Sequence, residues 1–145
     1  MNLFKISLLW LPALLLVSCD VLPDQNTDPQ TPEQLLLEIT DTRRFLNADQ
    51  IADRIINEDP SMLLIDVRSP GEYQTFTLPT AKNIPLAEIL GEEANALLDC
   101  SKYEIVFFSN GTVAAEQAWV LRRRQGCERV FVMEGGLNDW ADKIL

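Results

Sequence analysis

The sequence predicts an α/β domain with a mainly parallel central sheet flanked by helices on both faces. Three runs of four apolar residues, at 62–65, 105–108 and 130–133, have the length and composition of strands buried on both faces of such a sheet. A helical segment joins the last two runs, and strands connected through a helix lie parallel. The length of 145 residues suits one core of this kind rather than two.

The amino-acid composition excludes several classes of function. Acidic residues outnumber basic ones by 22 to 12, and the resulting net charge of −10 disfavours binding to nucleic acid. The chain has no histidine, which removes Ser-His and Cys-His catalytic pairs and imidazole metal ligands. Because the sequence also lacks a metal-ligand cluster, a phosphate loop and a dinucleotide fingerprint, we expect no metal and no cofactor.

Residues 1–18 are predicted to be a lipoprotein signal peptide. Lys5 precedes an apolar stretch over 6–17, which is too short to span a membrane but suits an export signal. The tetrad Leu16-Val17-Ser18-Cys19 resembles a bacterial lipobox, which implies cleavage before Cys19 and lipidation of that cysteine. Asp20 resembles a signal for retention at the inner membrane. We therefore expect an exported protein anchored by Cys19 to a bacterial membrane, the inner one favoured and the outer one possible.

Residues 19–44 are expected to form the lipidated cysteine, a flexible tether and a short helix. The stretch over 20–31 is polar and interrupted by prolines, as is typical of a tether. The sequence Thr31-Pro32-Glu33-Gln34 resembles a capping box with proline at the first helical position. A short helix is therefore predicted to begin at Pro32.

Residues 45–145 are predicted to be the folded domain. Asn47 is a suitable N-cap for a helix over 48–57, whose isoleucines lie on one face. A second helix over about 113–125 ends at Gly126. We interpret the three arginines at 122–124 as solvated residues that favour the helix dipole, and Trp119 and Trp140 as core residues.

Two groups of residues resemble the signatures of a known family. The first is Leu64-Ile65-Asp66-Val67-Arg68 with Glu72-Tyr73, and the second is Glu134-Gly135-Gly136-Leu137 with Asn138 and Trp140. Both are similar to motifs of the rhodanese family of sulfurtransferases, and the resemblance extends from Phe45 to Leu145. It implies a single rhodanese-like domain whose active loop follows the strand ending at Phe108. It also implies that Asp66 and Arg68 are a structural pair in the wall of that loop.

The loop after Phe108 lies where ligands bind in open α/β sheets, beyond the carboxyl ends of the strands. Its residues are Ser109, Asn110, Gly111, Thr112 and Val113, followed by Ala114. The resemblance places the nucleophilic cysteine of the family at Ser109 and its arginine at Ala114. A serine hydroxyl is barely ionised near neutral pH and cannot carry sulfur as a persulfide. The prediction is therefore a non-catalytic module that binds a small anion or a protein partner at this loop.

Two alternatives to a binding role stay open. One is residual sulfurtransferase or hydrolase activity, for which Asp66 or Glu72 is the candidate base beside Ser109. The other is a thiol-redox module that uses Cys100 and Cys127. Each of these cysteines precedes a predicted strand, so both belong to the sheet edge opposite the loop. They either form a disulfide or remain two buried thiols.

Overall fold

The computed structural model describes residues 31–145. The predicted signal peptide, the lipidation site Cys19 and most of the predicted tether lie outside the described residues. No helix in the described part is both long and apolar enough to cross a membrane. In chain order, the elements are α1 (Pro32–Thr40), η1 (Thr42–Arg44), β1 (Phe45–Leu46), α2 (Ala48–Ile56), β2 (Met62–Asp66), α3 (Pro70–Thr75), β3 (Lys82–Asn83), η2 (Leu86–Glu88), α4 (Glu92–Leu97), β4 (Glu104–Phe108), α5 (Val113–Arg124), β5 (Val130–Met133) and α6 (Gly136–Lys143).

Five parallel strands form one sheet in the order β1-β5-β4-β2-β3, which confirms the predicted fold class. β4 lies at the centre, with Ile105 opposite Leu63 of β2 and Val130 of β5. The three apolar runs of the sequence are β2, β4 and β5. The edge strands β1 and β3 have two residues each and are absent from the sequence prediction.

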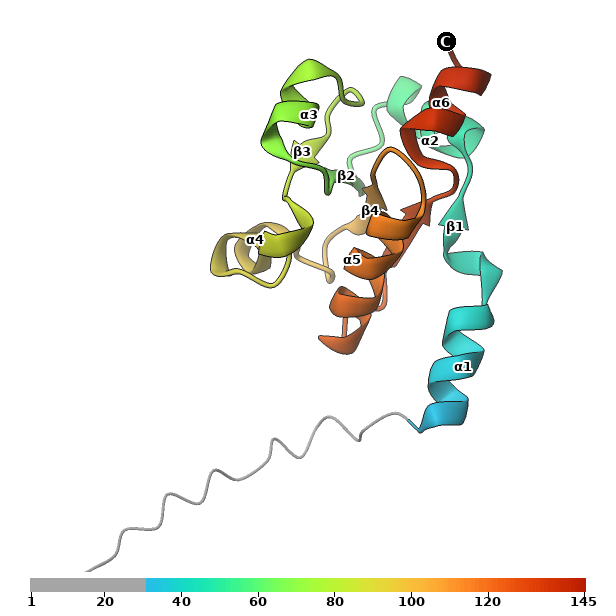
Figure 1. Ribbon diagram of the computed structural model, residues 1–145, viewed down its shortest axis with the longest axis vertical. Coiled ribbons are helices and arrows are strands. Elements are labelled where there is room, and N and C mark those ends of the chain that lie inside the picture. The colour runs from blue at the N-terminus through green and yellow to red at the C-terminus, as the bar shows by residue number, and fades with distance from the viewer. Residues whose placement is uncertain (1–30) are drawn as a thin grey trace, which may run out of the picture.

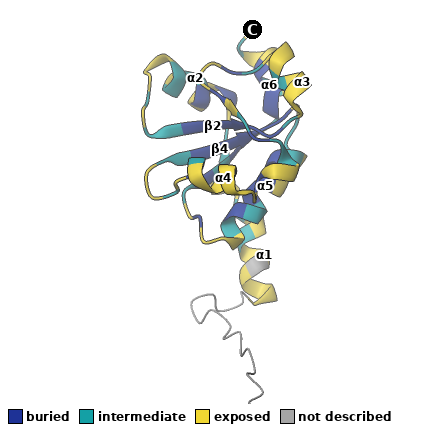
Figure 2. Ribbon diagram, turned by 90° about the vertical axis from the view of Figure 1, so that its left-hand side faces the viewer, coloured by how far each residue is buried: buried dark blue, intermediate teal, exposed yellow. Residues whose placement is uncertain are grey.

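Helices cover both faces of the sheet, so two apolar layers enclose it. Figure 1 shows the order of these elements along the chain, and Figure 2 shows the buried strands β2 and β4 between α2 and α6 on one side and α4 and α5 on the other. Alternate residues of β4 enter opposite layers: Phe107 packs with Trp119 of α5, and Phe108 packs with Trp140 of α6. Both phenylalanines are fully buried, as expected for the central strand of a two-sided sheet.

Capping boxes fix where three helices begin. The side chains of Thr31, Asn47 and Ser69 each accept the backbone N–H three residues later, and Gln or Glu at that position bonds back. Such N-caps contribute about 1 kcal/mol each. The predictions for the helices at Pro32 and after Asn47 are confirmed. Ser69 begins the six-residue α3, which the sequence analysis missed although the pattern is the same.

The interpretation of the three arginines at the end of α5 is wrong for Arg122, which is only 5% exposed. Its guanidinium donates to Oδ1 of Asn95 and Oε1 of Gln125, each at 2.6 Å, and to the carbonyl of Leu98. Burial lowers the pKa of Arg122. This side chain therefore holds α4 against α5 instead of facing solvent.

A disulfide joins Cys100 and Cys127 at the amino-terminal edge of the sheet, with 5.6 Å between their Cα atoms. The pairing is possible because the two cysteines precede β4 and β5, which are neighbours in the sheet. Cys127 is buried, and both cysteines pack against the layer under α4 and α5. The bond closes a loop that contains the whole of α5.

Replacing both cysteines by alanine is expected to lower the free energy of unfolding by about 3 kcal/mol, because the unfolded chain regains the freedom that the closed loop removes. Urea unfolding of the variant, followed by circular dichroism, measures this loss. Reduced wild-type protein should unfold at the midpoint of the variant. Equal midpoints for oxidised and reduced wild-type protein would contradict a stabilising bond.

Candidate functional site

The carboxyl end of the central strand β4 leads directly into the loop predicted as the functional site. Ser109 lies at its base and is only 6% exposed. The Ser109 hydroxyl donates to the carbonyl of Gly111 at 2.7 Å, so it is engaged within the loop. Neither Asp66 nor Glu72 bonds to this hydroxyl among the described residues. The arrangement thus lacks a base positioned to activate Ser109 as a nucleophile.

The start of α6 holds the outer side of the loop. The backbone N–H of Leu137 donates to the carbonyl of Ser109 at 2.8 Å, and that of Asn138 to the carbonyl of Asn110 at 3.0 Å. The hydroxyl of Thr112 accepts from the N–H of Gly135 at 3.1 Å. These bonds turn the carbonyls of the loop toward α6.

The backbone N–H groups of the loop are left without acceptors. In a trans peptide the N–H points opposite to the preceding carbonyl, so the N–H groups that follow Ser109 and Asn110 point away from α6. Within residues 31–145, no acceptor is bonded to the N–H groups of 110–115. The twelve-residue α5 begins at Val113 and adds the positive end of its dipole. A small anion is the ligand that these groups suit.

Gly136 permits the close contact between α6 and the loop. Its φ is +60°, and a Cβ at this position would lie 2.4 Å from the carbonyl oxygen of Ser109 and 2.7 Å from that of Gly111. Only glycine fits both the backbone conformation and the space. In the sequence this glycine is part of the second signature; two consecutive glycines one residue after a buried strand are the signal that marks it.

The wall of the site is an ion pair between Asp66 and Arg68 at the end of β2. The guanidinium Nη2 of Arg68 lies 2.6 Å from Oδ2 of Asp66, which is fully buried. The same carboxylate accepts from the hydroxyl of Thr77 at 2.9 Å. Arg68 also donates to the carbonyl of Phe76. The pair therefore ties β2 to the segment that follows α3.

Asn110 links the loop to this wall. Its Oδ1 accepts from Nη1 of Arg68 at 3.0 Å, and its Nδ2 donates to Oε1 of Glu72 at 2.9 Å. Bonds from the Ser69 hydroxyl and then from Asn110 lower the pKa of Glu72. The Asn110 amide thus holds the loop against the wall of the site.

The structure brings most of the predicted site residues together and separates the cysteines from them. Ser109, Asn110, Gly111 and Thr112 form the loop, and the pair Asp66 and Arg68 contacts it through Asn110. Val113 lies at its rim and is 70% exposed. Ala114 belongs to the first turn of α5. Cys100 and Cys127 lie at the amino-terminal edge of the strands, opposite the loop.

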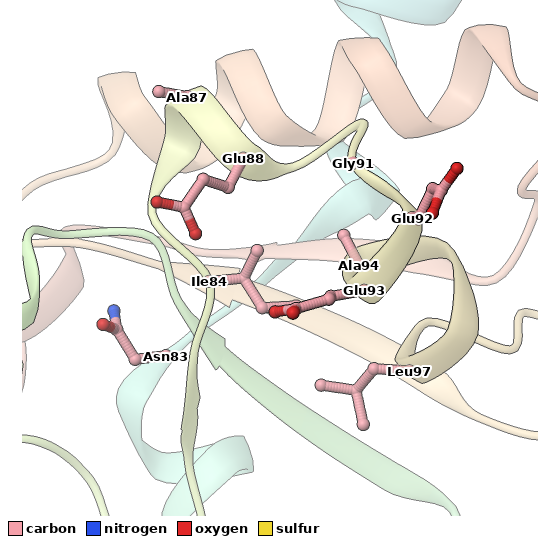
Figure 3. A pocket seen from close by; sticks show the side chains of 9 residues that line it. All are labelled: Asn83, Ile84, Ala87, Glu88, Gly91, Glu92, Glu93, Ala94 and Leu97. Carbon is pink, nitrogen blue, oxygen red and sulfur yellow. The ribbon is translucent and has the colours of Figure 1, made fainter.

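Two larger hollows lie outside the loop. One of about 590 Å³ lies between η2 and α4, and none of the predicted loop residues lines it. Figure 3 shows acidic residues, Glu88 and Glu93, and apolar ones, Ile84 and Leu97, among those that line it. The other, of about 550 Å³, lies along α5 and is bordered by Ile39 of α1 and by Val113. Neither contains a group suited to sulfur chemistry.

Comparison with known proteins identifies the family. The family model for the rhodanese-like domain matches residues 47–143. The mitochondrial thiosulfate sulfurtransferase RDL2 of Saccharomyces cerevisiae is 26% identical over 114 residues, which cover 72% of this chain and 76% of that protein. A tRNA uridine(34) hydroxylase of Escherichia fergusonii is 26% identical over 126 residues, 85% of this chain. This chain spans only about a third of that hydroxylase, with 34% covered.

Solved structures have the same fold. The crystal structure of RDL2 aligns with a TM-score of 0.60 and 25% identity, covering 72% of this chain and 94% of that chain. A rhodanese-related protein from Thermoplasma volcanium aligns with a TM-score of 0.59 and 21% identity, covering 70% and 93%. Since the family model matches most of the chain and the sheet and loop lie where this fold places them, the chain belongs to the rhodanese-like domain family.

Proposed function

We propose that this chain is a membrane-anchored rhodanese-like domain that binds a ligand or partner at the loop after β4 and transfers no sulfur. The observation that carries this proposal is the position of the Ser109 hydroxyl, bonded to the carbonyl of Gly111 at the base of the loop. Sulfur transfer needs a thiolate that accepts sulfur as a persulfide. An oxygen nucleophile has no stable equivalent of that intermediate.

The unpaired N–H groups of 110–115 support the binding of a small anion or of an acidic side chain of a partner. Ala114 adds no cationic side chain to them, and the guanidinium of Arg68 is bonded to Asp66, Asn110 and Phe76. Affinity for an anion therefore depends on the backbone donors and on the dipole of α5. The anchor in this proposal is Cys19, which lies in a sequence that resembles a lipobox.

A redox role for Cys100 and Cys127 is less well supported. The two sulfurs lie at the sheet edge far from the loop, and Cys127 is 4% exposed. A buried disulfide between neighbouring strands suits a structural function better than cycling with an external thiol.

Transfer of sulfur from thiosulfate to cyanide tests the proposal. Wild-type protein is expected to give no turnover above the uncatalysed rate. The double variant Ser109→Cys, Ala114→Arg is expected to gain turnover, because it supplies the thiolate and the cationic side chain at the positions that the resemblance assigns to them. Intact mass of protein purified from membranes tests lipidation, with Cys19→Ala as the variant that loses the acyl mass.

Val113→Cys is the matched control for the gained activity, because it places a thiol at the exposed rim of the same loop without removing a side-chain bond. It is expected to stay inactive if the position of the sulfur decides the chemistry. Turnover by the wild-type protein would overturn the binding proposal in favour of residual sulfurtransferase activity.

A further inference from the structure

We infer that α1, η1 and the C-terminal end of α5 form a surface that lies on a phospholipid bilayer, here named the basal surface. On the bilayer, Leu36 and Leu37 enter the interfacial region, and nearby arginines bind lipid phosphates. The inference rests on the proposed anchor at Cys19, and it adds how the domain is oriented on the membrane.

Exposed apolar side chains on α1 are the first observation. Leu36 is 62% exposed, Leu37 71% and Ile39 43%. The helix has nine residues, and helices shorter than about 12–15 residues are marginal without packing. An ion pair between Glu38 and Arg123 links α1 to α5, yet Leu36 and Leu37 stay exposed. Figure 2 shows α1 as a mostly exposed helix at one end of the domain.

The distribution of charge is the second observation. The segments that build the basal surface, residues 31–46 and 119–131, contain six arginines, of which Arg122 is buried, and four acidic residues. The remaining described residues contain five basic and fifteen acidic ones. Only the basal surface is therefore not repelled by lipid phosphates. Among its arginines, Arg124 is exposed, and Arg43, whose side chain is 90% exposed, pairs with Asp41 at 2.7 Å.

Two contacts show that these segments are one surface. The guanidinium of Arg123 pairs with Glu38 of α1. The guanidinium of Arg44, which follows α1, lies 5.1 Å from the ring of Trp119 in α5. Arg44 also pairs with Glu116 at 2.7 Å. The side chains that fix this geometry are thus distinct from Leu36, Leu37 and Arg124, which remain available to lipid.

The length of chain between the proposed anchor and α1 is the third argument. Twelve residues separate Cys19 from Pro32, and a fully extended chain spans at most about 3.6 Å per residue. With that anchor, the start of α1 stays within about 47 Å of the bilayer, because thirteen Cα–Cα steps join the two residues. α1 is the first described element after the proposed anchor, so that anchor would keep its exposed leucines within reach of a bilayer.

A fluorophore attached at residue 37 tests the inference. Acylated Leu37→Cys protein is labelled with an environment-sensitive dye and reconstituted in vesicles of phosphatidylcholine and phosphatidylglycerol. Cys19 is acylated and the other two cysteines are bonded, so the label is specific. Lipids brominated near the headgroup should quench the dye more than lipids brominated at the chain end, because interfacial helices lie about 5–10 Å deep.

Matched variants separate the contribution of the exposed leucines from that of the arginines. Ile56 of α2 is 79% exposed but lies outside the basal surface. A dye attached to the Ile56→Cys variant should therefore not be quenched. Adding Leu36→Asp or Arg124→Glu to the Leu37→Cys protein should reduce the quenching, whereas Lys82→Glu on β3 should not. Equal quenching at residues 37 and 56 overturns the inference, and so does a dye at residue 37 that stays in water.

The outcomes also distinguish this inference from the proposed anchor. If the intact mass lacks acyl chains, the anchor is wrong, and the labelled chain starting at Asp20 is mixed with the same vesicles. That chain retains every described element, both core layers and the disulfide. Quenching then upholds the basal surface without the anchor, and its absence overturns it. If the dye is shielded from water without lipid, and the shielding increases with protein concentration, α1 binds a second copy of the chain. That outcome overturns the inference.

Discussion

Gly136→Ala is expected to lower the free energy of unfolding by about 3 kcal/mol. Alanine is strained at a φ of +60°, and its Cβ would meet carbonyl oxygens of Ser109, Asn110 and Gly111 at 2.4–2.8 Å. These atoms belong to the backbone of the loop, so a side-chain rotation cannot relieve the contact. Chemical unfolding measures the loss.

Substitutions at two other glycines separate the two causes of this loss of stability, the backbone strain at positive φ and the steric contact of the added Cβ. Gly126 has a φ of +86°, and a Cβ added there would have nothing within 4 Å, so Gly126→Ala measures backbone strain alone, about 1–2 kcal/mol. Gly71 lies in α3 with open space around it, and Gly71→Ala should stabilise by up to about 1 kcal/mol. If Gly136→Ala costs no more than Gly126→Ala, the contact between α6 and the loop is not tight.

Asp66→Ala is expected to lower the free energy of unfolding by about 3–5 kcal/mol, because it leaves the guanidinium of Arg68 buried without its carboxylate. The Asp66 carboxylate is fully buried and the side chain of Arg68 is 9% exposed, so water does not replace the lost partner. The hydroxyl of Thr77 also loses its acceptor. Thermal and urea unfolding both report this loss.

The double variant Asp66→Ala, Arg68→Leu is the control for charge. It removes both members of the pair, so it should recover part of the stability lost in Asp66→Ala. Asp139→Ala, which breaks the exposed pair with Lys143 at 2.7 Å, should cost less than about 1 kcal/mol. If the double variant is less stable than Asp66→Ala, Arg68 stabilises the fold mainly through its bonds to Asn110 and Phe76.

The central strands could be predicted from the sequence because strands buried on both faces appear there as continuous apolar runs. β1 and β3 could not, since a strand of two residues has no period and pairs only because a neighbouring strand is already in place. α3 is a different case. Its capping box at Ser69 was present in the sequence, but six residues are too few to carry an apolar face.

The composition of the candidate loop was readable from the sequence, but its contacts were not. Ser109 could be placed at its base by counting along the resemblance. The role of Asn110 depends on Arg68 and Glu72, which are 42 and 38 residues away. Arg122 looked equivalent to its two neighbours in sequence. Its burial follows from Asn95 and Leu98 on a different segment, which no local pattern reveals.

The loop owes its shape to the last ten residues of the chain. Because the first turn of α6 holds the carbonyls of Ser109 and Asn110, the N–H groups of the loop are oriented only once α6 has packed against it. A chain that ends at Gly135 contains the residues of all five strands. It lacks Leu137 and Asn138, whose N–H groups hold the carbonyls of the loop. Removal of α6 would therefore release the loop, and it would also uncover the apolar layer in which Phe108 packs with Trp140 of α6.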